Sequence, residues 1–568
     1  MIPNACYFVN KKKRRIIVAK AYTEKRFSNF REIVNYAAET FGGNLAFKVK
    51  LEEGKYREIR YKELKDLYYR LCTHMIEKGL MGKRIAVTGN NCFQWAISYL
   101  CAATVGIVVP IDKELQAQDV NDFINAAECD AVFTDSKRNK AIKEIADRDL
   151  YHVDFEQLDS IISVSSIDAK TIDSITYEKD QMSILIFTSG TTGNSKGVCL
   201  SQYNICSNIH STCRMFRVNE EDSTLSILPL HHTYECTLDF ILFLTRGASI
   251  CYCDGLTKVQ KNMAEYSPSI LVVVPALLKV LSKRIKAKLA KDAPGKYKTY
   301  FETMPIADAL QKCPWIIRKV IISKVRQTLG GKLRVFIVGA AELDVSLIDD
   351  FAAFGVRTLQ GYGLTECAPL VAGNGDFHFN AASTGIAIPD VQVKIHNPND
   401  EGIGEILAKG DNIMLGYFND PEATAEVLKD GWFHTGDLGF MDENGDLFIK
   451  GRIKNVIVTE NGKNIYPEEL ETRLSQCPEI GEALVCAAES DGVTTVKAKI
   501  FPNMEYLKEK FGDKKLTEEE IKSAVQSAIK SVNSKIPNYK HIKMVEVLSN
   551  ALEKTTTQKI KRFGKNVK

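Results

Sequence analysis

Short apolar runs alternate with longer amphipathic stretches along the first third of the chain. Residues 84–89 (RIAVTG) and 105–112 (VGIVVPID) are apolar runs of strand length, and residues 90–104 between them have the length of a helix. The pattern repeats with a polar helical stretch at 114–128 and a β-rich run at 129–135. Strands that alternate with helices predict a parallel sheet with helices on both faces.

One part of this region imitates a membrane span, because no charged residue occurs between Arg84 and Asp112. That length could cross a bilayer. The segment nevertheless contains Asn90, Asn91 and Pro110, which interrupt it as turn signals do. We therefore predict a buried strand, helix and strand here rather than a membrane helix.

Further apolar runs at 183–187, 269–276 and 333–341 predict a second doubly wound layer of similar size. From residue 384 to 450 the pattern changes to short alternating strands and turn signals, without a long helix, which indicates a small β subdomain. The last hundred residues mix strands with a helix that begins after Thr517, where Thr517 and Glu520 could form a capping box.

The predicted fold is therefore α/β. A large N-terminal domain, residues 1–453, would contain two doubly wound α/β layers and the small β subdomain. A separate α+β lobe, residues 454–568, would follow it.

Composition excludes several classes of protein. A chain of 568 residues predicts about three to four domain-sized units. Its 45% hydrophobic and 26% charged residues exclude a disordered or fibrous chain. The 75 basic and 71 acidic residues leave a net charge of +4, so we expect no nucleic-acid partner.

The fifteen cysteines are scattered and form no CxxC pair, so neither a zinc site nor a disulfide framework is expected. The basic run 11–15 is followed by only four apolar residues, 16–19, which is shorter than the core of a signal peptide. These features predict a reducing, cytoplasmic location.

The loop TSGTTGNSKG, residues 188–197, carries the most specific chemistry. It follows an apolar strand and precedes a segment that could open a helix. Its glycines let successive backbone N–H groups point into one concavity, its hydroxyls add donors, and Lys196 adds positive charge. These groups suit a polyphosphate, although Ser195 stands where a Walker A loop has its second glycine. Taken alone, the loop could equally be solvated and without a ligand.

Five other strings accompany this loop: LPLHHTYE (228–235), GYGLTE (361–366), HTGDLG (434–439), GRIKN (451–455) and TTTQKIKR (555–562). In this order they resemble the adenylate-forming superfamily, which contains acyl-CoA synthetases, adenylation domains of peptide synthetases and firefly-type luciferases. The resemblance spans nearly the whole chain. It implies that Mg-ATP and a carboxylic acid give an acyl-adenylate and pyrophosphate, after which the acyl group passes to a thiol.

The resemblance also implies the residues that hold the nucleotide. The ATP phosphates would lie against Thr188, Ser189, Gly190, Thr191, Thr192, Gly193 and Lys196. The adenine side would be formed by Gly339, Ala340, Ala341, Gly361, Tyr362, Gly363 and Thr365, with the glycines letting the backbone approach the nucleotide. Asp437 would accept hydrogen bonds from the ribose hydroxyls, with Arg452 beside it. Glu366 and Thr188 are hard oxygen ligands suited to Mg²⁺.

Lys559 matches the lysine that enters the site during adenylation in this superfamily, where its ammonium would stabilise charge on the phosphates. It also lies in a basic tail, where a lysine is usually solvated. In the family the C-terminal lobe is mobile about a hinge, here Lys454, and Gly462 would then border the pantetheine tunnel of CoA. His232 matches the histidine near the substrate carboxylate.

The segment 279–334 is strongly basic, with 15 lysines and arginines against three acidic residues. Two stretches in it, 277–290 and 315–329, predict basic amphipathic helices; in the first, Leu277, Leu281, Ile285 and Leu289 recur at four-residue intervals. Such helices suit an anionic membrane surface or an acidic partner. The alternative is two helices packed on the core with solvated lysines. This insertion resembles the long-chain fatty-acid branch of the superfamily.

We therefore expect an acyl-CoA synthetase with ATP, Mg²⁺ and CoA, acting on a medium or long fatty acid or another carboxylic acid. It would be cytoplasmic, with peripheral contact at the inner membrane surface through 279–334. One alternative is a standalone ligase that loads an acyl or aryl acid onto a separate carrier protein, since no fused carrier domain is expected beyond Lys568. Another is a non-catalytic nucleotide-binding homologue.

Overall fold

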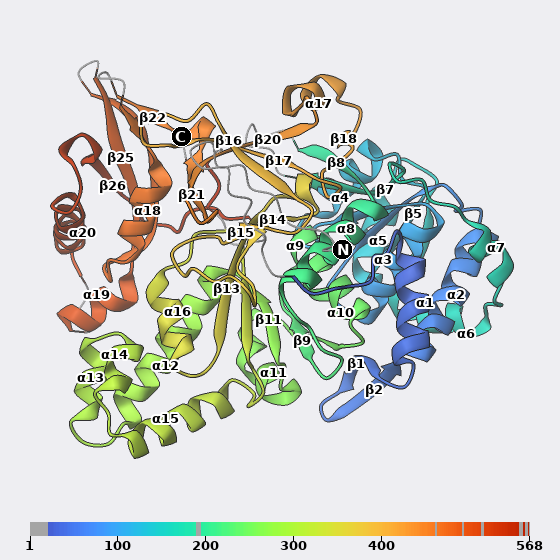
Figure 1. The fold of residues 1–568 in the computed structure, drawn as a ribbon, viewed down its shortest axis with the longest axis horizontal. Helices are drawn as coiled ribbons and strands as arrows, with labels where there is room; N and C mark the ends of the chain where they lie inside the picture. Colours follow the sequence, from blue (N-terminus) through green and yellow to red (C-terminus); the bar gives the residue numbers. More distant parts are fainter. Residues whose placement is uncertain are drawn as a thin grey trace. The chain divides into compact units, whose positions relative to one another are not determined.

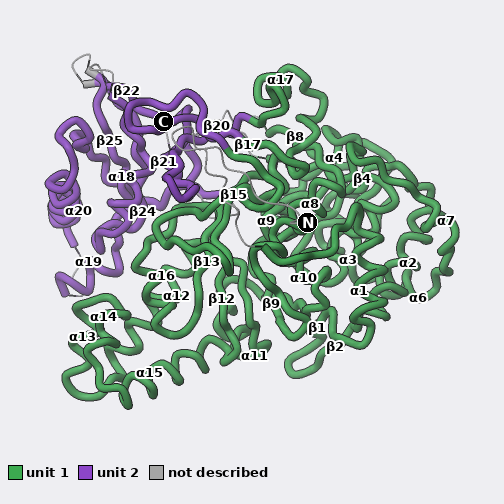
Figure 2. The backbone as a smooth tube through the Cα atoms, viewed as in Figure 1, with its two compact units in different colours: residues 1–190, 195–393, 408–433 green, residues 191–194, 394–407, 434–568 purple. Residues whose placement is uncertain are grey.

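The fold is that of a computed structural model, which describes residues 21–188, 195–459, 463–490, 493–512, 516–555, 560–562 and 566. The chain divides into two compact units (Figure 2). Unit 1 comprises Met1–Gly190, Ser195–Val393 and Ala408–Phe433, and unit 2 comprises Thr191–Asn194, Lys394–Leu407 and His434–Lys568.

The larger sheet of unit 1 has nine strands among the described residues. In spatial order they are β15 (Ile386–Ala387), β14 (Leu370–Gly373), β13 (Arg357–Gly363), β12 (Val335–Val338), β11 (Ile270–Val273), β9 (Ser223–Ser226), β10 (Ser249–Tyr252), β1 (Leu45–Glu52) and β2 (Lys55–Arg60). The neighbouring pairs from β13 to β1 are parallel, and the outer pairs are antiparallel.

The second sheet of unit 1 has seven described strands: β18 (Gly416–Tyr417), β8 (Lys196–Ser201), β7 (Met182–Thr188), β4 (Ile107–Ile111), β3 (Arg84–Thr88), β5 (Ala131–Thr134) and β6 (Tyr151–Asp154). Its pairs from β7 to β6 are parallel. Alternate residues of β3 enter different apolar clusters: Ile85 and Val87 pack in one and Ala86 in the other. Both faces of the sheet are therefore covered, as predicted.

Seventeen α-helices surround these sheets in the part of unit 1 that the structure describes (Figure 1). They are α1 (Phe30–Phe41), α2 (Tyr61–Glu77), α3 (Phe93–Val105), α4 (Ala117–Ala126), α5 (Ser136–Ile145), α6 (Phe155–Val164), α7 (Ala169–Ser174), α8 (Gln202–Met215), α9 (Thr233–Glu235), α10 (Leu242–Thr245), α11 (Val259–Tyr266), α12 (Pro275–Asp292), α13 (Tyr297–Thr303), α14 (Ile306–Gln311), α15 (Trp315–Thr328), α16 (Val345–Ala352) and α17 (Pro421–Val427).

The uncharged segment folds as strand β3, helix α3 and strand β4, with β3 and β4 paired in parallel. All but one residue of α3 are buried, so its apolar character comes from packing inside unit 1. Within the described ranges, no helix is both long and apolar enough to cross a bilayer. The predicted buried strand, helix and strand are confirmed.

The segment after the phosphate loop differs from the prediction. A helix was expected there, but β8 follows and pairs antiparallel with β7, and helix α8 begins only at Gln202. Ser201 caps that helix, accepting from the backbone N–H of Asn204. The apolar run 198–200 is buried in the sheet, and this burial makes it a strand.

Residues 392–452 form a five-stranded sheet of β16 (Gln392–His396), β17 (Gly404–Lys409), β20 (Trp432–Met441) and β19 (Leu428–Lys429), with β21 (Leu447–Arg452) paired to β20. The predicted small β subdomain is confirmed. Along β20, from Trp432 to Gly439, half-buried and buried residues alternate, which is the pattern of a strand with one face turned to the core.

The part of unit 2 that follows residue 454 is α+β, as predicted. Its described elements are β22 (Ile457–Val458), β23 (Asn464–Ile465), α18 (Pro467–Ser475), β24 (Ile480–Ser490), β25 (Val493–Pro502), α19 (Met504–Phe511), α20 (Glu518–Asn533) and β26 (Ile542–Val547). Thr517 and Glu520 form the expected capping box at the start of α20. Apolar residues of α18, α20 and the β24–β25–β26 sheet make a core of their own.

Candidate functional site

The carboxyl ends of neighbouring parallel strands bring several predicted residues to one edge of the nine-stranded sheet. His232 lies in the loop after β9, Gly339 and Ala340 follow β12, and Gly361 is near the end of β13. Ligands of open α/β sheets bind at this edge. The topology therefore places the histidine loop and the predicted adenine wall on the same side of one sheet.

Tyr234 joins these two groups directly. Its hydroxyl donates to the backbone oxygen of Ile337 at 3.0 Å, near the end of β12. A Cβ added at Gly339 would lie 3.0 Å from the Tyr234 ring, so the absence of a side chain at position 339 lets the ring pack there. Ala340 takes the left-handed backbone conformation, with φ of 73°.

Asn91 braces the loop that carries His232. Its Nδ2 donates to the backbone oxygen of Leu228 at 2.7 Å and to Ser226 Oγ at 2.9 Å. Its Oδ1 accepts from the backbone N–H of Leu230 at 3.1 Å. The sequence marked Asn91 only as a turn signal and not as a brace for this loop, because its hydrogen-bond partners lie more than 130 residues away along the chain.

A buried carboxyl braces the same loop from the other side. Glu235 Oε1 accepts from Ser226 Oγ at 2.7 Å and from the backbone N–H of Ile227 at 3.0 Å. Burial, with Asp239 nearby, raises the pKa of Glu235 well above its ordinary value. Burial likewise raises the pKa of Asp239 to about 7. Burial thus shifts the titration of both neighbouring acids toward the neutral form.

The two histidines of the loop differ in environment. Their ring centroids are 4.0 Å apart. His231 is buried, and burial lowers its pKa to about 3, so it is neutral near pH 7. His232 is half-buried at the N-cap of α9. Of the pair, His232 is the better placed to meet a substrate.

The strand residues at the two ends of the phosphate loop are paired with each other. Thr188 ends β7, Lys196 begins β8, and the two residues are register partners. The Thr188 hydroxyl donates to the backbone oxygen of Lys196 at 3.4 Å. The predicted phosphate-binding residues Ser189, Gly190, Thr191, Thr192 and Gly193 lie outside the described residues.

Tyr417 links the lysine of this loop to the candidate magnesium ligand. Lys196 Nζ lies 4.6 Å from the centroid of the Tyr417 ring, and the Tyr417 hydroxyl donates to Glu366 Oε1 at 3.0 Å. Strand β18, which carries Tyr417, pairs with β8. Three segments far apart in sequence therefore meet here, and Tyr417 itself was missed by the sequence analysis.

The residues present fit a magnesium ion that also binds substrate phosphates. Mg²⁺ usually takes one or two protein carboxylates and keeps water and phosphate oxygens for its other positions. Glu366 is partly exposed, and its Oε1 is oriented by the hydroxyl of Tyr417. No group of three or more His, Cys, Asp or Glu side chains that could hold a metal occurs within the described ranges.

Gly361, Tyr362 and Gly363 lie on β13, and Thr365 and Glu366 follow in the 3-10 turn Thr365–Cys367. A Cβ on Gly363 would lie 2.0 Å from the backbone oxygen of Pro369. This glycine therefore has a packing reason within the β13–β14 hairpin. Its contact with a nucleotide stays a prediction.

Asp437 and Arg452 are cross-strand partners in unit 2. They face each other in the register of β20 and β21, and Arg452 Nε forms an ion pair with Asp437 Oδ1 at 2.7 Å. Asp437 is buried, with 5% of its surface exposed, while Arg452 is more open. The structure thus brings together the two residues expected beside a ribose.

Lys559 and Gly462 lie outside the described residues. The chain on either side of Lys559 is fixed within unit 2: Lys554 and Ile560 form an antiparallel bridge, and Arg562 pairs with Glu471 at 2.5 Å. Burial raises the pKa of Glu471 to about 7, although Arg562 opposes this effect. The predicted hinge, Lys454, lies in the 3-10 turn Ile453–Asn455.

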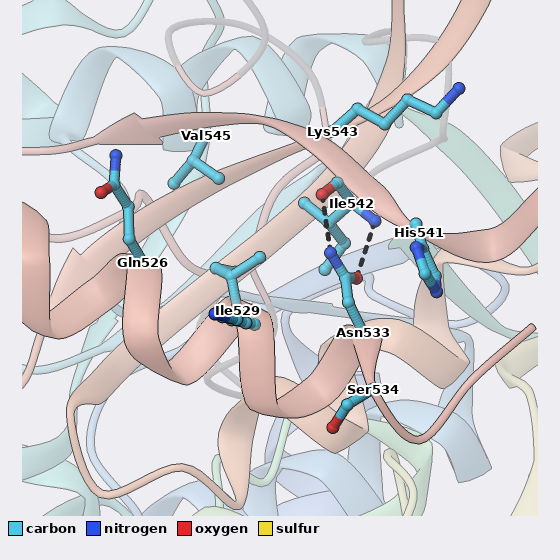
Figure 3. A pocket seen from close by; sticks show the side chains of 9 residues that line it. Gln526, Ile529, Asn533, Ser534, His541, Ile542, Lys543 and Val545 are labelled. Carbon is cyan, nitrogen blue, oxygen red and sulfur yellow. Dashed lines mark hydrogen bonds between the residues drawn. The ribbon is translucent and has the colours of Figure 1, made fainter. Parts of the chain in front are cut away.

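A separate groove of about 500 Å³ lies between α20 and β26 in unit 2 (Figure 3). Its lining residues are Gln526, Ile529, Lys530, Asn533, Ser534, His541, Ile542, Lys543 and Val545. The Asn533 amide exchanges two hydrogen bonds with the backbone of Ile542, at 3.0 and 2.9 Å. The Asn533 side chain therefore ties helix α20 to strand β26. None of the predicted site residues lines this groove.

Two family profiles match most of the chain. The profile of the AMP-binding enzyme family matches residues 34–418, and the profile of the AMP-binding enzyme C-terminal domain matches residues 454–564. Long-chain-fatty-acid–CoA ligase 5 of Rattus norvegicus is 29% identical over 76% of this chain and 69% of its own length. Long chain acyl-CoA synthetase 4 of Arabidopsis thaliana is 28% identical over 74% and 69%.

Solved structures share the fold. ATP-bound MatB from Rhodopseudomonas palustris superposes with a TM-score of 0.72 at 23% identity, covering 93% of this chain and 97% of its own. The Mycobacterium tuberculosis fatty acyl CoA synthetase gives a TM-score of 0.65 at 22% identity, covering 94% and 96%. The predicted fold class is confirmed.

Proposed function

The chain belongs to the AMP-binding enzyme family, and from that premise we propose that it is an AMP-forming acyl-CoA synthetase. The observation that carries the proposal is the link Lys196–Tyr417–Glu366, which joins the end of the phosphate loop to a carboxylate suited to Mg²⁺. A non-catalytic nucleotide-binding homologue would bind ATP but would exchange no pyrophosphate into ATP with any acid.

The proposed reaction has two steps. A carboxylate oxygen attacks the α-phosphorus of ATP, and the bond to pyrophosphate breaks, which leaves an acyl-adenylate. The sulfur of CoA then attacks the acyl carbon and expels AMP, with loss of the thiol proton. Because two anions meet in the first step, the site must neutralise phosphate charge and align the reactants.

We assign the charge control to the following residues. Lys196 and the loop 188–193 would hold the phosphates, and Glu366 with Thr188 would hold Mg²⁺, which would screen the phosphate charge when bound. Asp437 and Arg452 would hold the ribose, with 339–341, 361–363 and Thr365 on the adenine side. Lys559 would place an ammonium at the α-phosphate.

His232 would orient the substrate carboxylate from a loop that Asn91 and Glu235 keep in place. We place the domain boundary at 453/454, with Lys454 as the hinge about which the C-terminal lobe moves between the two steps. Gly462 would then border the pantetheine arm of CoA.

We propose a medium- or long-chain fatty acid as the substrate, supported by relatives whose names specify long-chain fatty acids. A ligase that loads a carrier protein is the second candidate, because the basic segment 279–334 could receive an acidic carrier. A pyrophosphate-release screen over acids of graded chain length, run with CoA and with carrier protein, tests both. Activity only with carrier protein would overturn the proposal, and so would a lack of activity with every acid tested.

We also propose that the enzyme works in the cytoplasm and contacts the inner membrane surface peripherally through the segment 279–334. The support is the local charge of that segment, with fifteen basic and three acidic residues. A fatty acid partitions into bilayers, so contact there would raise the local substrate concentration.

A further inference from the structure

Helix α15 exposes large apolar side chains on its outward face. Trp315 is 66% exposed, Ile316 59% and Val320 49%. The helix begins directly after Pro314, so the tryptophan stands in its first turn. In Figure 1, α15 lies at the lower edge of unit 1, and it contacts α11.

The opposite face of α15 is already used for packing. Ile321 and Val325 are buried in the cluster that also contains residues of α11 and α12. With 3.6 residues per turn, Ile316 and Val320 share one side of the helix, and Ile321 and Val325 share another. An ordinary surface helix would carry polar residues outward, so the outward apolar residues of α15 need a separate explanation.

The outward face is also basic. No aspartate or glutamate occurs between Asp308 and Glu342. Lys319 and Lys324 are exposed on α15, and Lys312 is exposed just before it. We call Trp315, Ile316 and Val320 with Lys312, Lys319 and Lys324 the α15 face.

We infer that the α15 face docks on the surface of an anionic lipid bilayer. Trp, Ile and Val can enter the boundary between headgroups and acyl chains, while the long lysine stems keep the ammonium groups among anionic headgroups. Charge complementarity favours this partner, because all the charged side chains of the α15 face are cationic. The inference deepens the proposed peripheral contact and does not depend on the enzyme's reaction.

This surface is narrower than the basic segment predicted from sequence. On α12 the apolar residues Leu278, Leu281, Ile285 and Leu289 are buried, so that helix follows the alternative of a helix packed on the core. One large apolar residue of α12, Val280, is exposed, at 46%. Basic charge on α12 would add long-range attraction, whereas α15 supplies the groups that insert.

Co-sedimentation of the full chain with vesicles tests the inference. Vesicles of phosphatidylcholine with phosphatidylglycerol should carry the protein down, and vesicles of phosphatidylcholine alone should carry far less. The variant W315A/I316S/V320S should bind the anionic vesicles about tenfold more weakly. Val164→Ser is the matched control, because Val164 is 85% exposed on α6 and should not matter.

Fluorescence of Trp315 gives a second readout at the surface itself. The chain has three tryptophans, and the others, Trp95 and Trp432, are buried and half-buried. Anionic vesicles should shift the emission to the blue, and brominated lipids should quench it. Trp315→Phe should remove both signals while keeping most of the binding.

Lys319→Glu with Lys324→Glu should weaken binding more than Lys288→Glu with Lys291→Glu on α12. Equal vesicle binding by W315A/I316S/V320S and the unmodified chain would overturn the inference, as would unquenched Trp315 in the bound state. If sedimentation velocity shows a dimer that is lost only in this triple variant, the α15 face is an interface between two copies of the chain. That result would also overturn the inference. Pyrophosphate release in detergent-free solution, without vesicles, reports separately on the proposed function.

Discussion

Arg452 Nε forms an ion pair with Asp437 Oδ1 at 2.7 Å across the paired strands β20 and β21. Asp437 is nearly buried, so its carboxylate is fixed in position before any ligand arrives. A fixed carboxylate can accept from two neighbouring hydroxyls at little ordering cost. This pair is therefore the preorganised part of unit 2.

Asp437→Asn should weaken ATP binding. The substitution keeps the size of the side chain but removes the charge that accepts from hydroxyls. Loss of a charged hydrogen bond costs about 1.5–3 kcal/mol, so the Kd for ATP should rise about 10- to 100-fold. Isothermal titration calorimetry would measure it, with Asp400→Asn on an exposed loop as the control. An unchanged Kd in a folded variant would contradict the ribose assignment.

Tyr417→Phe should raise the Mg²⁺ requirement. The change removes the hydroxyl that donates to Glu366 but keeps the aromatic ring beside Lys196. Loss of a partner that orients a metal ligand should increase the Mg²⁺ concentration for half-maximal adenylation by up to about tenfold. Tyr203→Phe, which removes a tyrosine bond to Asp411 elsewhere, is the matched control. Equal Mg²⁺ curves for the two variants would count against Glu366 as the metal ligand.

Asn91→Ala should impair use of the acid more than use of ATP. Without its three bonds the loop that carries His232 loses one brace, and misplaced groups can cost about 100-fold in rate. We expect kcat/KM for the acid to fall about 10- to 100-fold, with the KM for ATP little changed. The neighbour Asn90 is exposed, and Asn90→Ala should have no effect. Parallel losses for both substrates would point to general unfolding instead.

Asp239→Asn should change how stability depends on pH. Burial raises the pKa of Asp239 from 3.8 to about 7, so between these pH values the folded chain binds more protons than the unfolded chain. The stability of the unmodified protein should therefore fall, relative to the variant, as pH rises from about 4 to 7. The difference in Tm between Asp239→Asn and the unmodified protein should therefore grow across this range. The control Asp292→Asn, at an exposed position, should differ from the unmodified protein by the same amount at every pH. A constant Tm difference for Asp239→Asn would contradict the raised pKa.

Local patterns were sufficient for much of the fold. The uncharged run after Arg84 gave β3, α3 and β4 because its residues alternate between apolar runs and polar breaks. Thr517 and Glu520 marked the start of α20 because a capping box acts within four residues. The strand β8 was missed because its burial depends on pairing with β7 and β18, which the local sequence does not reveal.

The candidate site divides in the same way. Asp437 and Arg452 were recognisable from their short motifs, and the structure brings them into contact. Tyr417 and Asn91 could not be recognised in this way. Tyr417 binds a residue 51 positions away, and Asn91 binds residues more than 130 positions away. Residues that brace a site from a distant segment carry no motif of their own, so the packing of the fold is needed to find them.

The central claim is that Lys559 of the C-terminal lobe promotes attack of the carboxylate on ATP. Acid-dependent exchange of pyrophosphate into ATP measures that step directly, and Lys561→Ala, two positions along the same basic tail, is the control. Lys559→Ala should lose about 100-fold or more of the exchange rate while it still binds ATP and still passes a supplied acyl-adenylate to CoA. Exchange by Lys559→Ala at the rate of the unmodified protein would contradict the account.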